Sequence, residues 1–354
     1  MTDVIRVDPV SPDRAALKPA ADRLRAGALV AFPTETVYGL GAHAMDPVAV
    51  RRVFEAKGRP PHDPLIVHIS RIEALNQLVT AIPDAARALA AQFWPGPLTL
   101  VLGRATAVPD EVTAGLATVA VRIPSHPVAR ALLDLAGVPV AAPSANLFSR
   151  PSPTRASHVL EDLKDRIDVL VDGGATNVGI ESTVLDLTGD APTILRPGAI
   201  TLEALRKVLP QTVIASPGGR GASASLPSPG MLDKHYSPRV PMTLYEGTGA
   251  VDAIVADARL ARNRGQRVGI LAADEDRRKL GAAGGVEGGP PLKIVAVASA
   301  DDADGIAARL YGALRELDAA GVDLILARGF PARGGIGLAI QDRLRRAAGN
   351  RIAT

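Results

Sequence analysis

The sequence predicts an α/β protein with two sheets. A twisted mixed sheet with helices comes first, and a smaller parallel, Rossmann-like or flavodoxin-like α/β domain follows. The chain has 354 residues, which is more than usually fold around a single hydrophobic core. Residues 1–210 carry many short apolar runs, separated by helical patterns in some places and by hairpin-length gaps in others, which is typical of a mixed sheet. After residue 241 strand and helix patterns alternate regularly, which favours a parallel sheet.

Apolar runs predict the strands of the first part, at residues 28–32, 65–69, 98–102, 119–123, 138–142, 183–187 and 193–195. A helix separates the first two. Asp46 can cap it, Pro47 suits its first turn, and Gly58 can end it. Val50, Val53 and Phe54 would give this helix a buried face.

The second part has its own pattern. We expect strands at residues 242–245, 268–272, 293–297 and 323–327, and helices at residues 251–264, 303–320 and 337–348. Between the two parts, residues 216–237 are rich in Gly, Ser and Pro, as in a linker. We therefore predict a catalytic domain at 1–210, a flexible linker and possible active-site lid at 211–238, and a C-terminal domain at 239–354.

The composition excludes several classes of protein. With 40 basic and 37 acidic residues the net charge is only +3, so a nucleic-acid-binding face would need local clustering. The chain has no cysteine, which excludes disulfides, thiolate zinc sites and a thiol nucleophile. Its first residues lack the apolar core of a secretory signal, and no apolar run reaches the ~20 residues that span a bilayer. We expect a soluble, cytoplasmic protein.

Familiar catalytic and nucleotide-binding motifs do not explain the sequence. It contains no P-loop and no Gly-x-Ser-x-Gly elbow. Residues 39–44, GLGAHA, resemble a dinucleotide-binding turn, but a tight glycine turn without a cofactor is the favoured interpretation. His62 and His68 lack a third ligand at a suitable spacing, so no metal site is predicted.

Two cations follow the first helix. In an extended chain Lys57 and Arg59 would point to the same side, where they could hold a polyphosphate. The alternative is a pair of solvated cations that stabilise the end of the helix.

Further polar residues lie at strand ends. In residues 119–123 the apolar side chains share one face, so Arg122 projects from the other. Its partner would be either a carboxylate within the protein or a substrate carboxylate. Ser144 and Asn146 follow the run 138–142, where small residues would let a ligand approach the backbone. Such strand ends are common ligand sites in α/β sheets.

Several long motifs occur in an order that resembles one family. They are FPTETVYGLG, KGRP with DPLIVHI, FWPGPLTLVL, VAVRIPSHP, VPVAAPSANLFSRPSPT, DGG with GIESTVLDL, and ILRPGAI. Together they resemble the threonylcarbamoyl-AMP synthases, which have the YrdC-like fold. SPGMLDKHYSP and GFPARGGIGLAIQDRLRRAA resemble the long form of these enzymes, which has an additional C-terminal domain.

This resemblance implies a reaction. Family members combine L-threonine, bicarbonate or CO2, and ATP into threonylcarbamoyl-AMP and release pyrophosphate, with Mg2+ present. The product serves a partner transferase that modifies certain tRNAs. The resemblance thus implies small-molecule substrates, transient contact with that transferase, weak or no direct binding of nucleic acid, and no membrane.

The resemblance also implies roles for particular residues. The catalytic constellation falls on Lys57, Arg59, Ser144 and Asn146. Threonine binding falls on Thr36, His68, Arg122, the backbone at Ala142, and Ser182. ATP binding falls on Lys57, Arg59, Asp63, Thr118, Ser144, Asn146, Ser152, Arg196, His235 and Tyr236. Asp63 stands where many relatives carry Asn; an acid there would repel triphosphate unless it holds Mg2+ or points away.

Two other functions stay open. One is an RNA-binding module without adenylating activity, which would need exposed aromatic residues among basic ones, and aromatics are only 3% of the chain. The other is carbamoyl transfer of the hydrogenase-maturation type, which usually comes with acylphosphatase and zinc-finger segments that this sequence lacks.

Overall fold

The computed structural model describes residues 1–215, 235–281, 290, 292–332, 334–349 and 351–354. Two compact units divide the chain. The first unit comprises residues 1–148 and 152–231, and the second comprises residues 149–151 and 232–354. Residues 216–234 of the expected linker lie outside the described residues, so its role as a lid stays a prediction.

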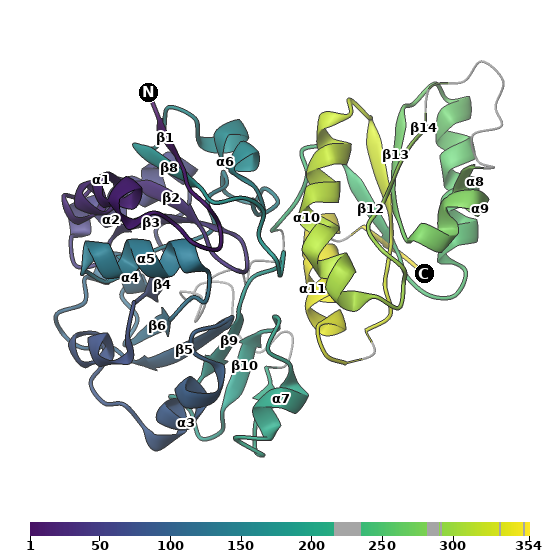
Figure 1. Ribbon diagram of the computed structural model, residues 1–354. Coiled ribbons are helices and arrows are strands. Elements are labelled where there is room, and N and C mark those ends of the chain that lie inside the picture. Colours follow the sequence, from purple (N-terminus) through teal and green to yellow (C-terminus); the bar gives the residue numbers. More distant parts are fainter. Residues whose placement is uncertain (216–234, 282–289, 291, 333, 350) are drawn as a thin grey trace. The chain divides into compact units, whose positions relative to one another are not determined.

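A mixed sheet forms the centre of the first unit (Figure 1). In the described residues its order is β1-β8-β2-β3-β7-β4-β6-β5-β9-β10-β11. The strands are β1 (Asp3–Arg6), β2 (Val30–Pro33), β3 (Tyr38–His43), β4 (Ile66–His68), β5 (Leu98–Gly103), β6 (Thr118–Arg122), β7 (Val140–Ala141), β8 (Val169–Asp172), β9 (Thr183–Asp186), β10 (Thr193–Arg196) and β11 (Val213–Ile214). The sheet contains parallel pairs such as β4 and β6 as well as antiparallel pairs such as β2 and β3, which confirms the predicted mixed sheet.

Helices of the first unit cover both faces of this sheet. They are α1 (Arg14–Arg25), α2 (Pro47–Lys57), the 3-10 helix η1 (Ile72–Gln77), α3 (Asp84–Phe93), α4 (Asp110–Thr113), α5 (Pro127–Ala136), α6 (Ala156–Leu163) and α7 (Leu202–Arg206). Strand β2 shows how the alternation of side chains builds two cores. Val30 and Phe32 belong to the cluster that includes α1 and α5, whereas Ala31 belongs to the cluster that includes α2.

The glycine-rich residues 39–44 are not a turn, so that interpretation is wrong. Most of them belong to strand β3, between β2 and β7. A side chain at Gly41 would place its Cβ 2.8 Å from Cε1 of Phe32 and 2.9 Å from Cγ1 of Val140. The glycine is needed because its neighbours pack closely against the strand.

The second unit contains a parallel sheet of order β14-β13-β15-β12-β16 in its described residues, as the sequence predicts. Its strands are β12 (Met242–Tyr245), β13 (Val268–Ala272), β14 (Leu292–Ala296), β15 (Leu324–Arg328) and β16 (Ile352–Ala353). Its helices are α8 (Ala250–Asn263), η2 (Asp274–Asp276), α9 (Arg277–Gly281), α10 (Ala303–Ala319) and α11 (Gly337–Ala348). Helices α10 and α11 cover one face, and α8 and α9 the other (Figure 1). None of the described helices is long and apolar enough to cross a membrane.

Candidate active site

The two predicted phosphate-binding cations lie at the end of helix α2: Lys57 is its last residue, and Arg59 follows Gly58. Asp46 caps the helix by accepting hydrogen bonds from the backbone N–H groups of Val48 and Ala49, and Gly58 ends it in a left-handed conformation, φ 62°. Lys57 is therefore helical, so the expected extended geometry of residues 57–59 is wrong. The alternative of solvated cations is also wrong, because the side chains of Lys57 and Arg59 are buried.

The ammonium of Lys57 holds the loop that follows β7. Its Nζ donates hydrogen bonds to the carbonyl oxygens of Ser144, at 2.5 Å, and Asn146, at 2.6 Å. The backbone N–H of Phe148 donates in return to the carbonyl oxygen of Lys57, at 2.9 Å. Residues about ninety positions apart in the sequence are thus joined by hydrogen bonds. They include three of the four predicted catalytic residues, Lys57, Ser144 and Asn146.

The guanidinium of Arg59 binds the loop that contains Asp63 and Pro64. Its Nε donates to the carbonyl oxygen of Asp63, at 3.2 Å, and its Nη2 to that of Pro64, at 2.9 Å. The same Nη2 lies 2.9 Å from the Asp63 carboxylate, which is fully buried. Burial raises the pKa of Asp63, although the charges of Arg59 and Lys57 act in the opposite direction. Asp63 therefore faces Arg59 and does not point away into solvent.

Arg122, at the end of β6, has a carboxylate partner within the protein. Its Nη2 lies 2.6 Å from Oε1 of Glu35, its Nη1 donates to Thr36 Oγ1 at 3.0 Å, and its Nε donates to the carbonyl oxygen of Gly96 at 3.2 Å. Burial would raise the pKa of Glu35, but the guanidinium of Arg122 holds it below its usual range. The structure thus brings the predicted residues Thr36 and Arg122 together, and it adds Glu35.

His68 lies beside Arg122 in the sheet, because β4 and β6 pair with these two residues in register. Its side chain is buried, and its ring meets that of Phe32 edge-on at a centroid distance of 6.4 Å. Burial, together with the nearby charge of Arg122, lowers the pKa of His68 to about 3. At neutral pH His68 is an uncharged imidazole that can exchange hydrogen bonds but adds no cation.

Ser182 and Arg196 form another buried group. Arg196 Nε and Nη2 donate to the carbonyl oxygen of Ser182, at 3.2 and 3.0 Å, and Nη2 also donates to Ser182 Oγ, at 3.1 Å. Ser182 Oγ lies 2.8 Å from Thr99 Oγ1, and Ser152 Oγ donates to Glu181 Oε1 at 2.6 Å. Ser182, Ser152 and Arg196 are predicted site residues, whereas Thr99 was not identified from the sequence.

The remaining predicted residues lie in different places. The N–H of Ala142 donates to the carbonyl oxygen of Ile66, so this backbone is part of the sheet beside His68. Thr118 begins β6 and Arg122 ends it, so the two are ~13 Å apart along the strand and do not form one cluster. His235 and Tyr236 belong to the second unit and are buried, with the Tyr236 ring 5.5 Å from that of Tyr311. Their contribution to ATP binding stays a prediction.

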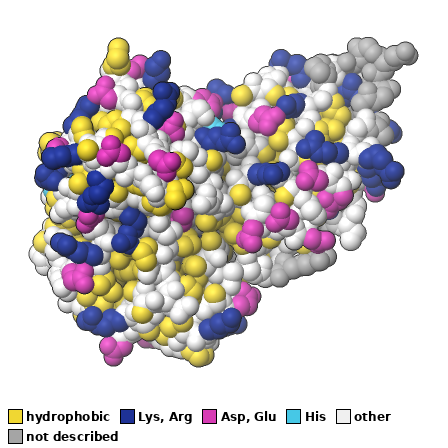
Figure 2. Space-filling view, in the orientation of Figure 1, with side chains coloured by type: hydrophobic (Ala, Val, Ile, Leu, Met, Phe, Trp, Pro, Cys, Tyr) yellow, Lys and Arg dark blue, Asp and Glu magenta, His cyan; other side chains and the backbone are white. Residues whose placement is uncertain are grey.

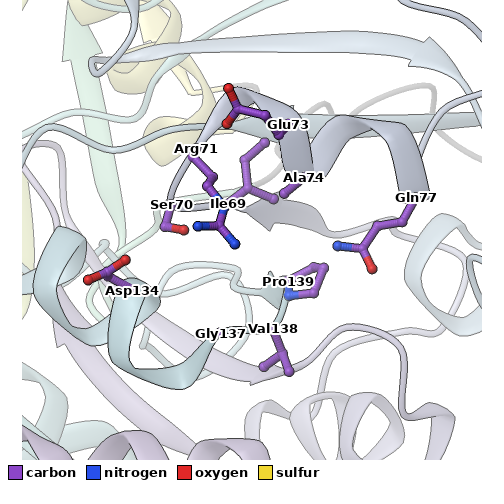
Figure 3. A pocket seen from close by; sticks show the side chains of 10 residues that line it. All are labelled: Ile69, Ser70, Arg71, Glu73, Ala74, Gln77, Asp134, Gly137, Val138 and Pro139. Atoms are coloured by element: carbon purple, nitrogen blue, oxygen red, sulfur yellow. The ribbon is translucent and has the colours of Figure 1, made fainter.

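A cavity of about 220 Å³ lies elsewhere in the first unit, between η1 and the end of α5 (Figure 3). Its polar lining includes Arg71, Gln77 and Asp134. None of its ten lining residues is a predicted site residue. The candidate active site is therefore defined by the buried polar network and not by this cavity.

Two family models match the chain. One, described as "Telomere recombination", matches residues 22–198, and one described as "Threonylcarbamoyl-AMP synthase, C-terminal domain" matches residues 200–349. The threonylcarbamoyl-AMP synthase of Pyrococcus abyssi is 44% identical over 339 residues, which cover 94% of each chain. That of Bacillus subtilis is 44% identical over 347 residues, which cover 98% of this chain and 96% of the relative.

A solved structure also resembles the whole chain. The crystal structure of P. abyssi Sua5 complexed with L-threonine matches with a TM-score of 0.89 and 42% sequence identity, and the match covers 99% of both chains. The likeness therefore extends over both units.

We predict that Gly198→Ala destabilises the first unit by roughly 1–3 kcal/mol. A Cβ at Gly198 would lie 2.3 Å from the backbone nitrogen of Thr183 and 2.5 Å from the carbonyl carbon of Ser182. Backbone atoms cannot move aside as a flexible side chain can. Urea unfolding followed by the fluorescence of Trp94, the only tryptophan, measures the change in the first unit. Gly189→Ala is the control, because its Cβ would meet nothing within 4 Å; equal effects of both substitutions would contradict the prediction.

We also predict that stability falls as the pH drops below 6.5, with a contribution of about 1.4 kcal/mol per pH unit from His68. The unfolded chain protonates this histidine near pH 6.5, whereas the folded protein keeps it neutral down to a pKa of about 3. Between these values the unfolded state binds the additional proton, so acid favours unfolding.

Urea unfolding monitored by Trp94 at several pH values tests this contribution. His68→Gln should flatten the dependence between pH 6.5 and 4, because glutamine does not titrate. His62→Gln alters an exposed side chain and should leave the dependence as it is. An unchanged slope in His68→Gln would show that other groups cause the acid sensitivity.

Proposed function

The chain belongs to the threonylcarbamoyl-AMP synthase family, and on this premise we propose that it condenses L-threonine, bicarbonate or CO2, and ATP into threonylcarbamoyl-AMP with release of pyrophosphate. One observation carries the proposal. The buried ammonium of Lys57 bonds to the carbonyl oxygens of Ser144 and Asn146, so a cation at the end of α2 and the backbone of two residues from a distant loop meet at one place. The family match over both units supports it.

The amino-acid half of the proposed site centres on Arg122. A guanidinium can bind a carboxylate through two parallel hydrogen bonds. Because Glu35 Oε1 lies 2.6 Å from Nη2, the carboxylate of threonine must displace Glu35 or share the guanidinium with it. Thr36 and Ser182 would offer hydroxyl groups, neutral His68 an imidazole, and Ala142 its backbone, for the remaining polar atoms of the amino acid.

The phosphate half would use the cations and the loops that they hold. Lys57 and Arg59 lower the cost of placing the triphosphate there, since a buried anion needs fixed opposite charges. Ser144, Asn146, Ser152 and Arg196 would add hydrogen bonds to ATP. Thr118, His235 and Tyr236 complete the set that the motifs assign to ATP.

The chemistry needs no covalent enzyme intermediate. The neutral amine of threonine attacks the carbon of CO2 and loses a proton, which gives a carbamate. A carbamate oxygen then attacks the α-phosphorus of ATP, and the bond to pyrophosphate breaks. Catalysis on this scheme comes from orientation and from charges fixed in advance, which the network around Lys57 provides.

Magnesium would accompany ATP and offset negative charge on the leaving pyrophosphate. Among the described residues, Asp63 would be a ligand only in competition with Arg59: carboxylate oxygen is a ligand that Mg2+ prefers, but Arg59 Nη2 lies 2.9 Å from this carboxylate. The ion is otherwise held by phosphates in sites of this type.

The product would pass to a transferase that modifies tRNA, in the cytoplasm, where ATP and threonine are available. Direct binding of RNA by this chain is less well supported. Figure 2 shows Lys and Arg side chains interspersed with Asp and Glu over the visible face, without a large basic patch. A mixed surface gives little of the phosphate attraction that drives such binding.

Labelled bicarbonate, supplied with ATP, Mg2+ and one amino acid at a time, tests the proposed reaction. We expect labelled carbamoyl adenylate and pyrophosphate with threonine, and less product with serine, which lacks the methyl group. Salt-sensitive RNA binding without any threonine-dependent pyrophosphate would instead support the RNA-binding function.

We predict that Lys57→Ala and Arg59→Ala each lower threonine-dependent pyrophosphate release by at least about a hundredfold, because each removes a fixed charge beside the reacting phosphates. Circular dichroism should show a folded protein in both cases. Arg51→Ala is the matched control, since this exposed side chain lies on the same helix and pairs with Glu111. Near-normal pyrophosphate release from the two variants would refute the assignment.

A further inference from the structure

Three consecutive residues near the site belong to the second unit. Ser149–Pro151 group with residues 232–354, although Phe148 before them and Ser152 after them belong to the first unit. The chain enters this tripeptide through a left-handed residue, Ser149, with φ 66°. A non-glycine residue adopts this conformation only where surrounding contacts hold it.

Each residue of the tripeptide is bonded to another part of the second unit. The N–H of Ser237 donates to the carbonyl oxygen of Ser149 at 2.7 Å. Arg150 Nη2 donates to Asp318 Oδ2 at 3.1 Å, and Arg315 Nη2 donates to the carbonyl oxygen of Pro151 at 2.6 Å. Arg315 and Asp318 are three residues apart on α10, so they present both groups from one side of the helix.

The carboxylate of Asp318 is the centre of this arrangement. Its side chain is 1% exposed, and within the described part of the chain it accepts hydrogen bonds from Arg239, Val240 and Arg150, four in all. Three come from the N–H and Nε of Arg239 and from the N–H of Val240, at 2.7, 2.8 and 3.1 Å. The fourth comes from Arg150. Burying an acid costs several kcal/mol unless such donors compensate it, so Arg150 supplies one of the donors that this buried carboxylate needs.

The tripeptide interrupts the segment that carries the predicted phosphate-binding groups. Upstream, Lys57 holds the carbonyl oxygens of Ser144 and Asn146. Downstream, Ser152 bonds to Glu181 at 2.6 Å. Three residues span at most ~10 Å, so the position of Ser149 restricts where Asn146 can lie, and the position of Pro151 restricts Ser152 directly.

We infer that Arg150, Arg315 and Asp318 are positioning residues for the proposed reaction: they fix residues 149–151 within the second unit and thereby set the course of the loop that presents Ser144, Asn146 and Ser152 to ATP. The inference rests on the proposed function for its kinetic consequence. It assigns a role to the second unit, which acts through the covalent chain and touches no reacting atom.

Arg150→Ala in the full-length chain is the primary test. Asp318 keeps its donors from Arg239 and Val240 in this variant, so the second unit remains folded. We expect kcat/KM for ATP to fall about tenfold to a hundredfold, as for a misplaced catalytic group, whereas KM for threonine changes little. Arg150→Lys retains a cation and should recover part of the loss.

Asp323→Asn is the matched control. Asp323 accepts hydrogen bonds from the N–H, Nε and Nη2 of Arg267, at 2.7, 3.3 and 2.7 Å, so it repeats the Asp318–Arg239 geometry in the same unit. Among the described residues, Asp323 forms no hydrogen bond or ion pair with residues 149–151. Its kinetics should match those of the unsubstituted protein.

Amide hydrogen exchange gives a readout that does not depend on activity. In Arg150→Ala, peptides covering residues 144–152 should exchange at least about tenfold faster, while peptides of α10 keep their protection. Unchanged exchange at 144–152, or an unchanged kcat/KM for ATP in an active enzyme, overturns the inference. If the unsubstituted protein forms no threonylcarbamoyl-AMP, the proposed function is refuted instead. The exchange comparison would then still decide whether the bond between Arg150 and Asp318 fixes residues 149–151.

Discussion

The buried ammonium of Lys57 is the interaction on which the candidate active site depends. A cation removed from water needs several acceptors around it, and the carbonyl oxygens of Ser144 and Asn146 supply two. These bonds join the end of α2, where Gly58 ends the helix, to the loop after β7. The helix end and the loop therefore hold their places as one network.

The same requirement explains the partners of two other buried cations, Arg122 and Arg59. Arg122 meets Glu35, and Arg59 meets Asp63, in each case at less than 3 Å. Both carboxylates come from loops that follow a secondary-structure element: the turn between β2 and β3, and the segment after α2. Internal acids thus balance the cations that a substrate carboxylate or phosphate would use. Such a site is charged and rigid before a ligand arrives, which lowers the reorganisation that binding requires.

The sequence predicts an element correctly where its structure depends on residues that are close together in the chain. The caps of α2 follow from Asp46, Pro47 and Gly58 alone, and the alternation around Arg122 correctly placed its side chain away from the apolar face. The parallel sheet of the second unit follows from its regular alternation. The glycines of β3 do not follow from local rules, because their cause is not local. The side chains of Phe32 and Val140 leave no space at Gly41, and neither neighbour can be identified from sequence spacing.

The partners of buried charges such as Glu35 and Asp318 are the part of the structure that the sequence predicts least well, because these partners lie far apart in the chain. Glu35 lies inside a recognisable motif, yet its pairing with Arg122 spans about ninety residues and follows from the order of the strands. Asp318 has no local signature at all, since an acid on an amphipathic helix normally faces water. Its burial is explained by donors that come from two segments far away in the sequence: Arg239 and Val240 supply three of them, and Arg150 supplies another. Residues 149–151 belong to the second unit and are covalently continuous with Phe148 and Ser152 of the first, so contacts that no sequence pattern reveals restrain the chain on both sides of this tripeptide.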